Sequence, residues 1–289
     1  MVLVRFAQFI DYENRLTEIS NSLMGLLAGS KLASHLLILN EGSTKLLPEV
    51  FPKVEHIQRF SLTSEKAREI LEEAEVHLGT MGTPYILALH EDFMNVCINF
   101  FQQGLLGLTS TTSMKLSLQH KHFEKITGMT FSADSIGQLH VIRCMRNCVI
   151  HNGGKVNQAL LSAISALTSS AVGDWSKLAS EPFRFMKVGD PFHFGHSEMI
   201  LTLAITKKLA KETNEILQKK ILPIVWADLI VQEMLTVERH LLSRSDILRK
   251  VNGYARHNFN ALSLSSEELE KAISRVKNKK GALPHELQP

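Results

Sequence analysis

Apolar residues recur at helical spacing along almost the whole chain. Over residues 1–40 they fall mostly three or four positions apart, which fits a period of 3.6 residues better than the alternation of a strand. These positions are Phe6, Phe9, Ile10, Leu16, Ile19, Leu23, Leu26 and Leu27. The same spacing predicts helices within residues 64–78, 84–101, 113–126, 132–151, 156–167, 197–217, 223–242 and from 265 onward. We therefore expect an all-α protein.

Glycine and proline are expected to separate two of these helices. Gly79 and Gly82 favour a stop after the helix that begins near residue 64. Pro84 suits the first turn of the helix that follows, because its missing N–H is not needed there.

One stretch departs from the helical pattern. Residues 173–191 are rich in loop-forming residues. The pieces 183–188 and 192–194 alternate enough to form a short β-hairpin. The sequence thus predicts helices with room for one small hairpin.

Capping residues mark two helix starts. Ser132 or Asp134 can cap the helix that ends near residue 151. Ser265 and Glu268 have the S-x-x-E spacing of a capping box, in which each side chain bonds the backbone N–H of the other.

The length of the chain, 289 residues with 44% hydrophobic, suits one large helical domain or two average ones. We expect residues 1–63 to form an N-terminal helical segment packed on the core and residues 64–220 to form the main helical domain. Residues 221–289 would be a C-terminal helical extension.

Charge and cysteine content limit the partners and the cellular compartment that the sequence favours. Thirty-two Lys and Arg against twenty-nine Asp and Glu give a net charge of +3, which permits a polyanionic partner without demanding one. Three cysteines with no C-x-x-C indicate reduced thiols. No apolar run approaches the roughly 20 residues of a membrane span, and no signal peptide is evident. We expect a cytoplasmic protein with no membrane contact.

One segment, residues 139–154, carries candidate chemistry. At about 100° per residue, its apolar residues form one side of a helix: Leu139, Val141, Ile142, Met145, Val149 and Ile150. The other side is formed by His140, Arg143, Asn147 and His151. Arg146 falls inside the apolar arc, where a guanidinium is costly unless it is paired, hydrogen-bonded or able to reach solvent. The simplest interpretation is a solvent-facing histidine at a helix C-terminus, favoured by the dipole, and one Arg whose stem packs on apolar surface.

A resemblance points further. Arg146-Asn147-x-x-x-His151 ends a predicted helix and is followed directly by Asn-Gly-Gly. This arrangement closely resembles the R-polar-x3-H signature of HEPN domains, which are all-helical modules of ribonuclease toxins and anti-phage proteins. The resemblance covers roughly residues 64–220 and implies a HEPN-like helical bundle.

The resemblance implies metal-independent cleavage of RNA, with no cofactor. His151 would correspond to the acid or base acting on the ribose 2′-hydroxyl, Arg146 to the phosphate ligand, and Asn147 to the residue that orients the histidine. Imidazole can take and give a proton near neutral pH, and guanidinium offers a planar fork to phosphate oxygens. Arg143 stays an alternative phosphate ligand, because it shares the helical face of Asn147 and His151.

The same resemblance implies partners. These are RNA, a second copy of the chain bound through the motif helix, and an antitoxin or other regulatory protein as a further candidate. The setting would be a toxin–antitoxin system or anti-phage defence. The alternative function is a non-catalytic HEPN-like module that binds RNA or protein, and a third hypothesis is a helical scaffold in which the motif is coincidence.

Other patterns lack the residues their chemistry needs. His120 and His122, or His193 and His196, could begin a metal site, but neither pair has a third ligand at a recognised spacing. No P-loop, G-x-G-x-x-G or G-x-S-x-G sequence occurs. We therefore expect no metal and no nucleotide cofactor.

Overall fold

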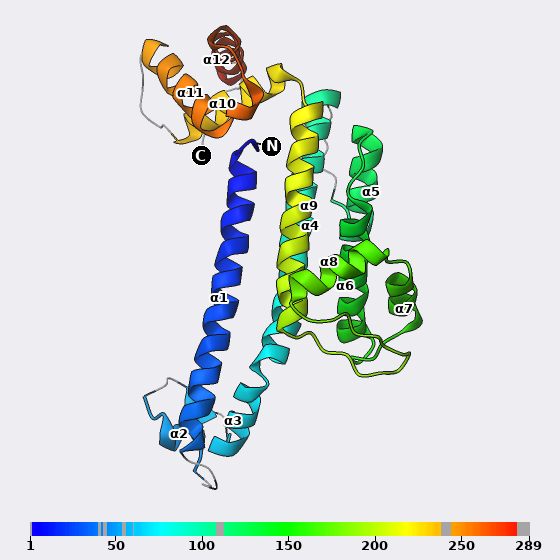
Figure 1. Ribbon diagram of the computed structural model, residues 1–289. Coiled ribbons are helices and arrows are strands. Elements are labelled where there is room, and N and C mark those ends of the chain that lie inside the picture. Colours follow the sequence, from blue (N-terminus) through cyan, green and yellow to red (C-terminus); the bar gives the residue numbers. More distant parts are fainter. Residues whose placement is uncertain are drawn as a thin grey trace. The chain divides into compact units, whose positions relative to one another are not determined.

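The computed structural model describes residues 2–39, 42, 45–53, 56–59, 61–107, 113–237 and 244–281 (Figure 1). These residues contain twelve α-helices, two short 3-10 helices and no strand. The predicted all-α class is therefore confirmed. Across the same residues, no helix has a stretch apolar and long enough to cross a bilayer.

Most of the chain lies in helices longer than two turns. The α-helices are α1 (Ala7–Ile38), α2 (Leu47–Val50), α3 (Ser64–Glu72), α4 (Ala74–Leu106), α5 (Leu116–Thr127), α6 (Ala133–His151), α7 (Gln158–Ser165), α8 (Ser169–Ala179), α9 (His196–Lys220), α10 (Pro223–Val237), α11 (Arg244–Asn258) and α12 (Ser266–Gly281). The 3-10 helices are η1 (Ile57–Arg59) and η2 (Asn260–Leu262).

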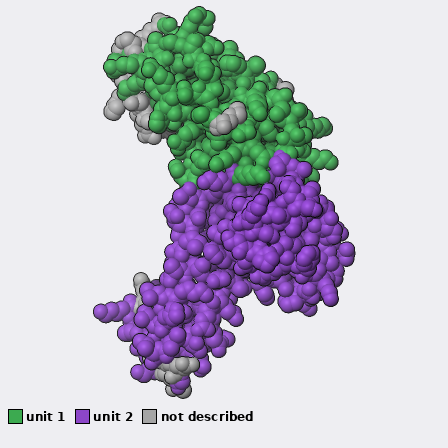
Figure 2. All heavy atoms as spheres, viewed as in Figure 1, with its two compact units in different colours: residues 1–14, 90–131, 208–289 green, residues 15–89, 132–207 purple. Residues whose placement is uncertain are grey.

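The chain divides into two compact units, each assembled from separate stretches (Figure 2). Unit 1 contains residues 1–14, 90–131 and 208–289. Unit 2 contains residues 15–89 and 132–207. Three of the four boundaries fall within α1, α4 and α9, so each of these helices contributes residues to both units. The division into 1–63, 64–220 and 221–289 stays a prediction.

The core of unit 1 is aromatic. The ring of Trp226 lies 5.3 Å from that of Phe100, 5.9 Å from Phe6 and 6.0 Å from Phe259. Helices α10, α11 and α12 pack on one another beside this cluster. Burying several aromatic side chains together supplies a large share of the hydrophobic stabilisation of a small unit.

Unit 2 is organised around α6, which packs against α7 and α8. The buried amide of Gln138 donates to the carbonyl of Ala171 at 2.8 Å. The hydroxyl of Thr168, which also caps α8, donates to Asp134 at 2.7 Å. These hydrogen bonds join α8 to the first half of α6. The second half of α6, which contains the predicted motif, takes no part in them.

The predicted break near residue 80 is wrong, because α4 runs without interruption through Gly79, Gly82 and Pro84. A Cβ at Gly79 would stand 2.7 Å from the carbonyl oxygen of Phe194, and one at Gly82 would stand 3.0 Å from the side chain of Leu23. These glycines therefore permit close packing and do not end the helix. Burial of the helix face outweighs the weak local preference of glycine.

The loop prediction is also wrong in part. Residues 169–179 form α8. Residues 183–194 form no hairpin, and they pair instead with residues 154–156 through an isolated antiparallel bridge between Lys155 and Pro191. The alternation of apolar residues reflects burial of Phe192 and Phe194 within unit 2, not strand pairing within the segment.

The predicted caps form. The Ser132 hydroxyl accepts from the backbone N–H of Ser135 at the start of α6. At the start of α12 the Ser265 N–H donates to Glu268 at 2.7 Å, and the Glu268 N–H donates back to the Ser265 hydroxyl at 3.2 Å. Both starts follow from local sequence alone.

Candidate functional site

The predicted motif occupies the last turns of α6, and the helix ends at His151 as predicted. Gly153 and Gly154 have φ values of 60° and 71°, which glycine adopts without strain. The N–H groups of Asn152 and Gly154 both donate to the carbonyl of Cys148 at 3.1 Å. The chain therefore folds back over the helix C-terminus, and residues 152–154 lie close to the last turn.

The three predicted site residues share this helix end but differ in exposure. Arg146 is half-buried, whereas Asn147 and His151 are exposed. Nη1 of Arg146 donates to Oδ1 of Asn147 at 3.2 Å. The Asn147 side chain therefore accepts a hydrogen bond from Arg146 and forms none with His151. Its proposed role in orienting His151 stays a prediction.

Arg143 lies nearer the middle of α6. It is half-buried, and it lies close enough to His140 to act on its charge. Partial desolvation of the His140 ring, followed by repulsion from Arg143, lowers the pKa of His140. His140 is therefore mainly neutral at pH 7, and Arg143 is the fixed cation of that part of the helix.

The two cysteines of α6 do not add a nucleophile. Cys144 and Cys148 are buried free thiols. Burial raises the pKa of Cys144. A thiol that resists ionisation is a poor nucleophile.

A long loop crosses the end of α6. The N–H of Phe192 donates to the carbonyl of Gly154 at 2.7 Å. The N–H of Val156 donates to the backbone carbonyl of Asp190 at 2.9 Å, and the N–H of Gly189 donates to the carbonyl of Val156 at 2.9 Å. These three bonds fix residues 189–192 beside the turn that follows His151. We call residues 181–195 the crossing loop.

The crossing loop brings a second histidine to the motif. A Cβ at Gly154 would stand 3.9 Å from Cε1 of His193. The residues on either side, Phe192 and Phe194, are 4% and 0% exposed, whereas His193 is exposed. From the sequence, His193 was a candidate metal ligand only. The one signal for its placement was the Phe-His-Phe alternation, which points the central side chain away from the core.

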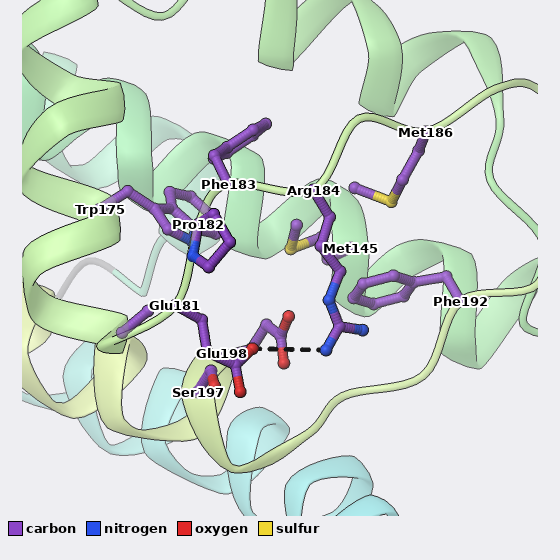
Figure 3. Close-up of a pocket in the computed structure, with 11 residues that line it drawn as sticks. Met145, Trp175, Glu181, Pro182, Phe183, Arg184, Met186, Phe192, Ser197 and Glu198 are labelled. Atoms are coloured by element: carbon purple, nitrogen blue, oxygen red, sulfur yellow. Dashed lines mark hydrogen bonds and ion pairs between the residues drawn. The ribbon is translucent and has the colours of Figure 1, made fainter.

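A small pocket lies beneath the crossing loop (Figure 3). Apolar side chains from three parts of unit 2 line it, namely Met145, Trp175, Phe183 and Phe192. Arg184 points toward the same space and pairs with Glu181 at 3.4 Å. Buried Glu198 accepts the N–H of Gly195 at 2.9 Å. Residues near both ends of the crossing loop therefore line the pocket. His193 does not line it and is exposed to solvent.

Exposed cations and one aromatic ring lie in the turn after the motif and on the crossing loop. Lys155, Arg184 and Lys187 are exposed. Phe185, between the last two, is 94% exposed. Within the described residues, no group of three or more His, Cys, Asp or Glu side chains could hold a metal ion. The chemistry that these residues offer is proton transfer and anion binding.

Comparisons with protein-family models, curated proteins and solved structures found no match to this chain. The site is therefore interpreted from its own residues.

Proposed function

We propose that this protein is a metal-independent endoribonuclease of the HEPN type. The observation that carries the proposal is the exposed imidazole of His151 at the end of α6, on the same turns as Arg146 and Asn147. A proton-transfer group and a fixed cation at one exposed helix end can start cleavage of RNA by its own 2′-hydroxyl and stabilise the charge that develops on the phosphate.

The proposed reaction begins at the ribose. His151 takes the proton of the 2′-hydroxyl, whose oxygen attacks the adjacent phosphorus. Arg146 binds the non-bridging phosphate oxygens and stabilises the negative charge that develops on them. The bond to the 5′-oxygen breaks and that oxygen takes up a proton, which leaves a 2′,3′-cyclic phosphate on one product and a 5′-hydroxyl on the other. The hydrogen bond from Arg146 to Asn147 limits the motion of the guanidinium before substrate binds.

The crossing loop supports RNA as the substrate. Single strands bind to surfaces that combine cations with aromatic rings on which bases stack. Phe185 is almost fully exposed between Arg184 and Lys187. The ring contacts that of Phe183, with 6.3 Å between centroids, but most of its surface is left in water and is available to stack on a base.

We further propose that the active form is a homodimer through α6. Ile150, one turn beyond Arg146 on the same side of the helix, is 47% exposed. A partner that covers Ile150 would also desolvate Arg146 and strengthen its attraction to phosphate. An antitoxin or other regulatory partner, and a place in defence, remain predictions.

The test is cleavage of single-stranded RNA by the purified full chain in excess EDTA. We expect wild type to release products with cyclic phosphate ends, identified by mass spectrometry. His151→Ala should lower the rate by about 10²–10⁴-fold, the usual contribution of a general base. Arg146→Ala should also lower it, and the exposed His35→Ala serves as the matched control.

Four results would refute or change the proposal in different ways. Cleavage that survives both His151→Ala and Arg146→Ala would refute the site. A larger loss in Arg143→Ala than in Arg146→Ala would make Arg143 the phosphate ligand. Binding of RNA without any cleavage would favour the non-catalytic module, and neither binding nor cleavage would favour a helical scaffold.

A further inference from the structure

We infer that His193 is the second proton-transfer group of this site and donates a proton to the departing 5′-oxygen of RNA. This inference rests on the proposed function, which assigns only the first proton transfer, at His151. The observation behind it is that the crossing loop places the His193 ring beside Gly154, in the turn that ends α6.

The chemistry requires a second group. The base must be neutral when it accepts the 2′-proton, and the acid must be protonated when the 5′-oxygen leaves. One imidazole cannot hold both states in the same step. An alkoxide is a poor leaving group in water, so a positioned acid contributes substantially to the rate.

The two rings come from different elements, as in-line displacement by a separate base and acid requires. The attacking and leaving oxygens lie on opposite sides of phosphorus, so the base and the acid must approach from different directions. His151 comes from α6, and His193 comes from the crossing loop. Gly154 is three residues from His151, a span of at most about 10 Å even when extended, and the turn at Cys148 shortens it.

Both rings are available to substrate. Of the residues that the structure describes, none forms a hydrogen bond or ion pair with the imidazole of His151 or of His193. Both side chains are exposed. A histidine with a packing or capping role would instead be buried or bonded, as His90 and His120 are in unit 1.

The loop that carries His193 is held from both sides. Phe192 and Phe194 are buried, and the Phe192 N–H is bonded to Gly154. The absence of a side chain at Gly79 lets α4 approach the carbonyl groups of Phe194 and Gly195. This support fixes the backbone of His193, as a proton donor requires.

The proposed step forms one bond to phosphorus, breaks another and transfers two protons. The 2′-oxygen forms a bond to phosphorus, and its proton passes to Nε2 or Nδ1 of His151. The bond from phosphorus to the 5′-oxygen breaks, and its electron pair stays on that oxygen. The oxygen takes a proton from His193, which becomes neutral. Hydrolysis of the cyclic phosphate would use the two histidines in reversed roles.

The experiment compares two substrates that differ in the leaving group. One is a dinucleotide, whose ribose oxygen needs a proton to depart. The other is the para-nitrophenyl ester of uridine 3′-monophosphate, whose phenolate departs without one. We expect His193→Ala to lower cleavage of the dinucleotide by about 10²–10⁴-fold and that of the ester less than about threefold. His151→Ala should lower both, and His35→Ala neither.

The pH profile provides the second readout. For the dinucleotide, wild type should give a bell-shaped profile, and His193→Ala should lose the alkaline limb, which reports the acid. Equal losses on the two substrates would show a structural or phosphate-binding role and overturn the inference. So would no loss on either substrate. No cleavage of either substrate by wild type would refute the proposed function itself, and the inference with it.

Discussion

Replacing His90 tests how unit 1 responds to acid. His90 is fully buried between two partners. Its Nδ1 lies 3.2 Å from the Tyr12 hydroxyl, and its Nε2 lies 3.2 Å from Nε2 of His120. Burial, followed by repulsion from His120, holds the pKa of His90 well below its ordinary value. The folded protein therefore keeps this ring neutral at pH values where the unfolded chain binds a proton.

The sign and size of the effect follow from linkage. A depressed histidine pKa contributes stability that is present above the unfolded pKa, about 6.5, and lost as the pH falls toward the folded value. Each pH unit below about 6 then removes about 1.4 kcal/mol for one proton. Between pH 7.5 and 5.0 the His90 contribution to the free energy of unfolding should fall by about 2 kcal/mol.

The assay is urea unfolding of wild type and His90→Gln at several pH values from 7.5 to 5.0. Glutamine can still bond Tyr12 and His120 but does not titrate. We expect the difference in unfolding free energy between the two proteins to shift by about 2 kcal/mol in favour of the variant as the pH falls. His35→Ala, at an exposed position, should keep the wild-type slope.

A parallel pH dependence in wild type and His90→Gln would refute this reasoning. It would mean that His90 takes up its proton in the folded state as readily as in the unfolded chain. The steric fit of glutamine does not affect this test, because a fixed packing penalty shifts the variant equally at every pH.

Two further predictions concern packing and a buried carboxylate. Gly79→Ala should destabilise the protein by about 1–3 kcal/mol because the new methyl group meets the Phe194 carbonyl. Gly173→Ala should stabilise it by about 0.5–1 kcal/mol, because Gly173 lies in α8 with open space around it. Thermal unfolding that ranks the stabilities of the two variants the other way would refute the packing argument. Glu233 accepts the Ala7 N–H at 2.9 Å and the Tyr254 hydroxyl at 3.0 Å, and burial raises its pKa. A raised carboxyl pKa gives stability that is present at low pH and lost as the pH rises through that pKa, so the unfolding free energy of Glu233→Gln should rise relative to that of wild type from pH 4.5 to 7. Glu233→Ala should lower the unfolding free energy by about 1–3 kcal/mol in urea unfolding. A difference between the glutamine variant and wild type that stays constant with pH would argue against the burial of this charge.

Much of the local structure was predictable from short stretches of sequence. The periodicity of apolar residues indicated the helical class, and the caps at Ser132 and Ser265 were correct because a capping bond spans only three residues. The end of α6 at His151 was also predicted, since Asn-Gly-Gly favours left-handed backbone at that point. The composition of the motif turn, with Arg146, Asn147 and His151, needed no tertiary information.

Long-range packing determined the rest. Gly79 looked like a helix stop because its closest contact, the Phe194 carbonyl, lies more than a hundred positions away. The segment around Phe192 was predicted as a hairpin because alternating apolar residues indicate that one face is buried but do not identify the surface that buries it. His193 joined the motif for the same reason, through a backbone bond between Phe192 and Gly154. Helical periodicity and capping depend on near neighbours, whereas these placements depend on which distant backbone fills the space, and that is settled only when the whole unit packs.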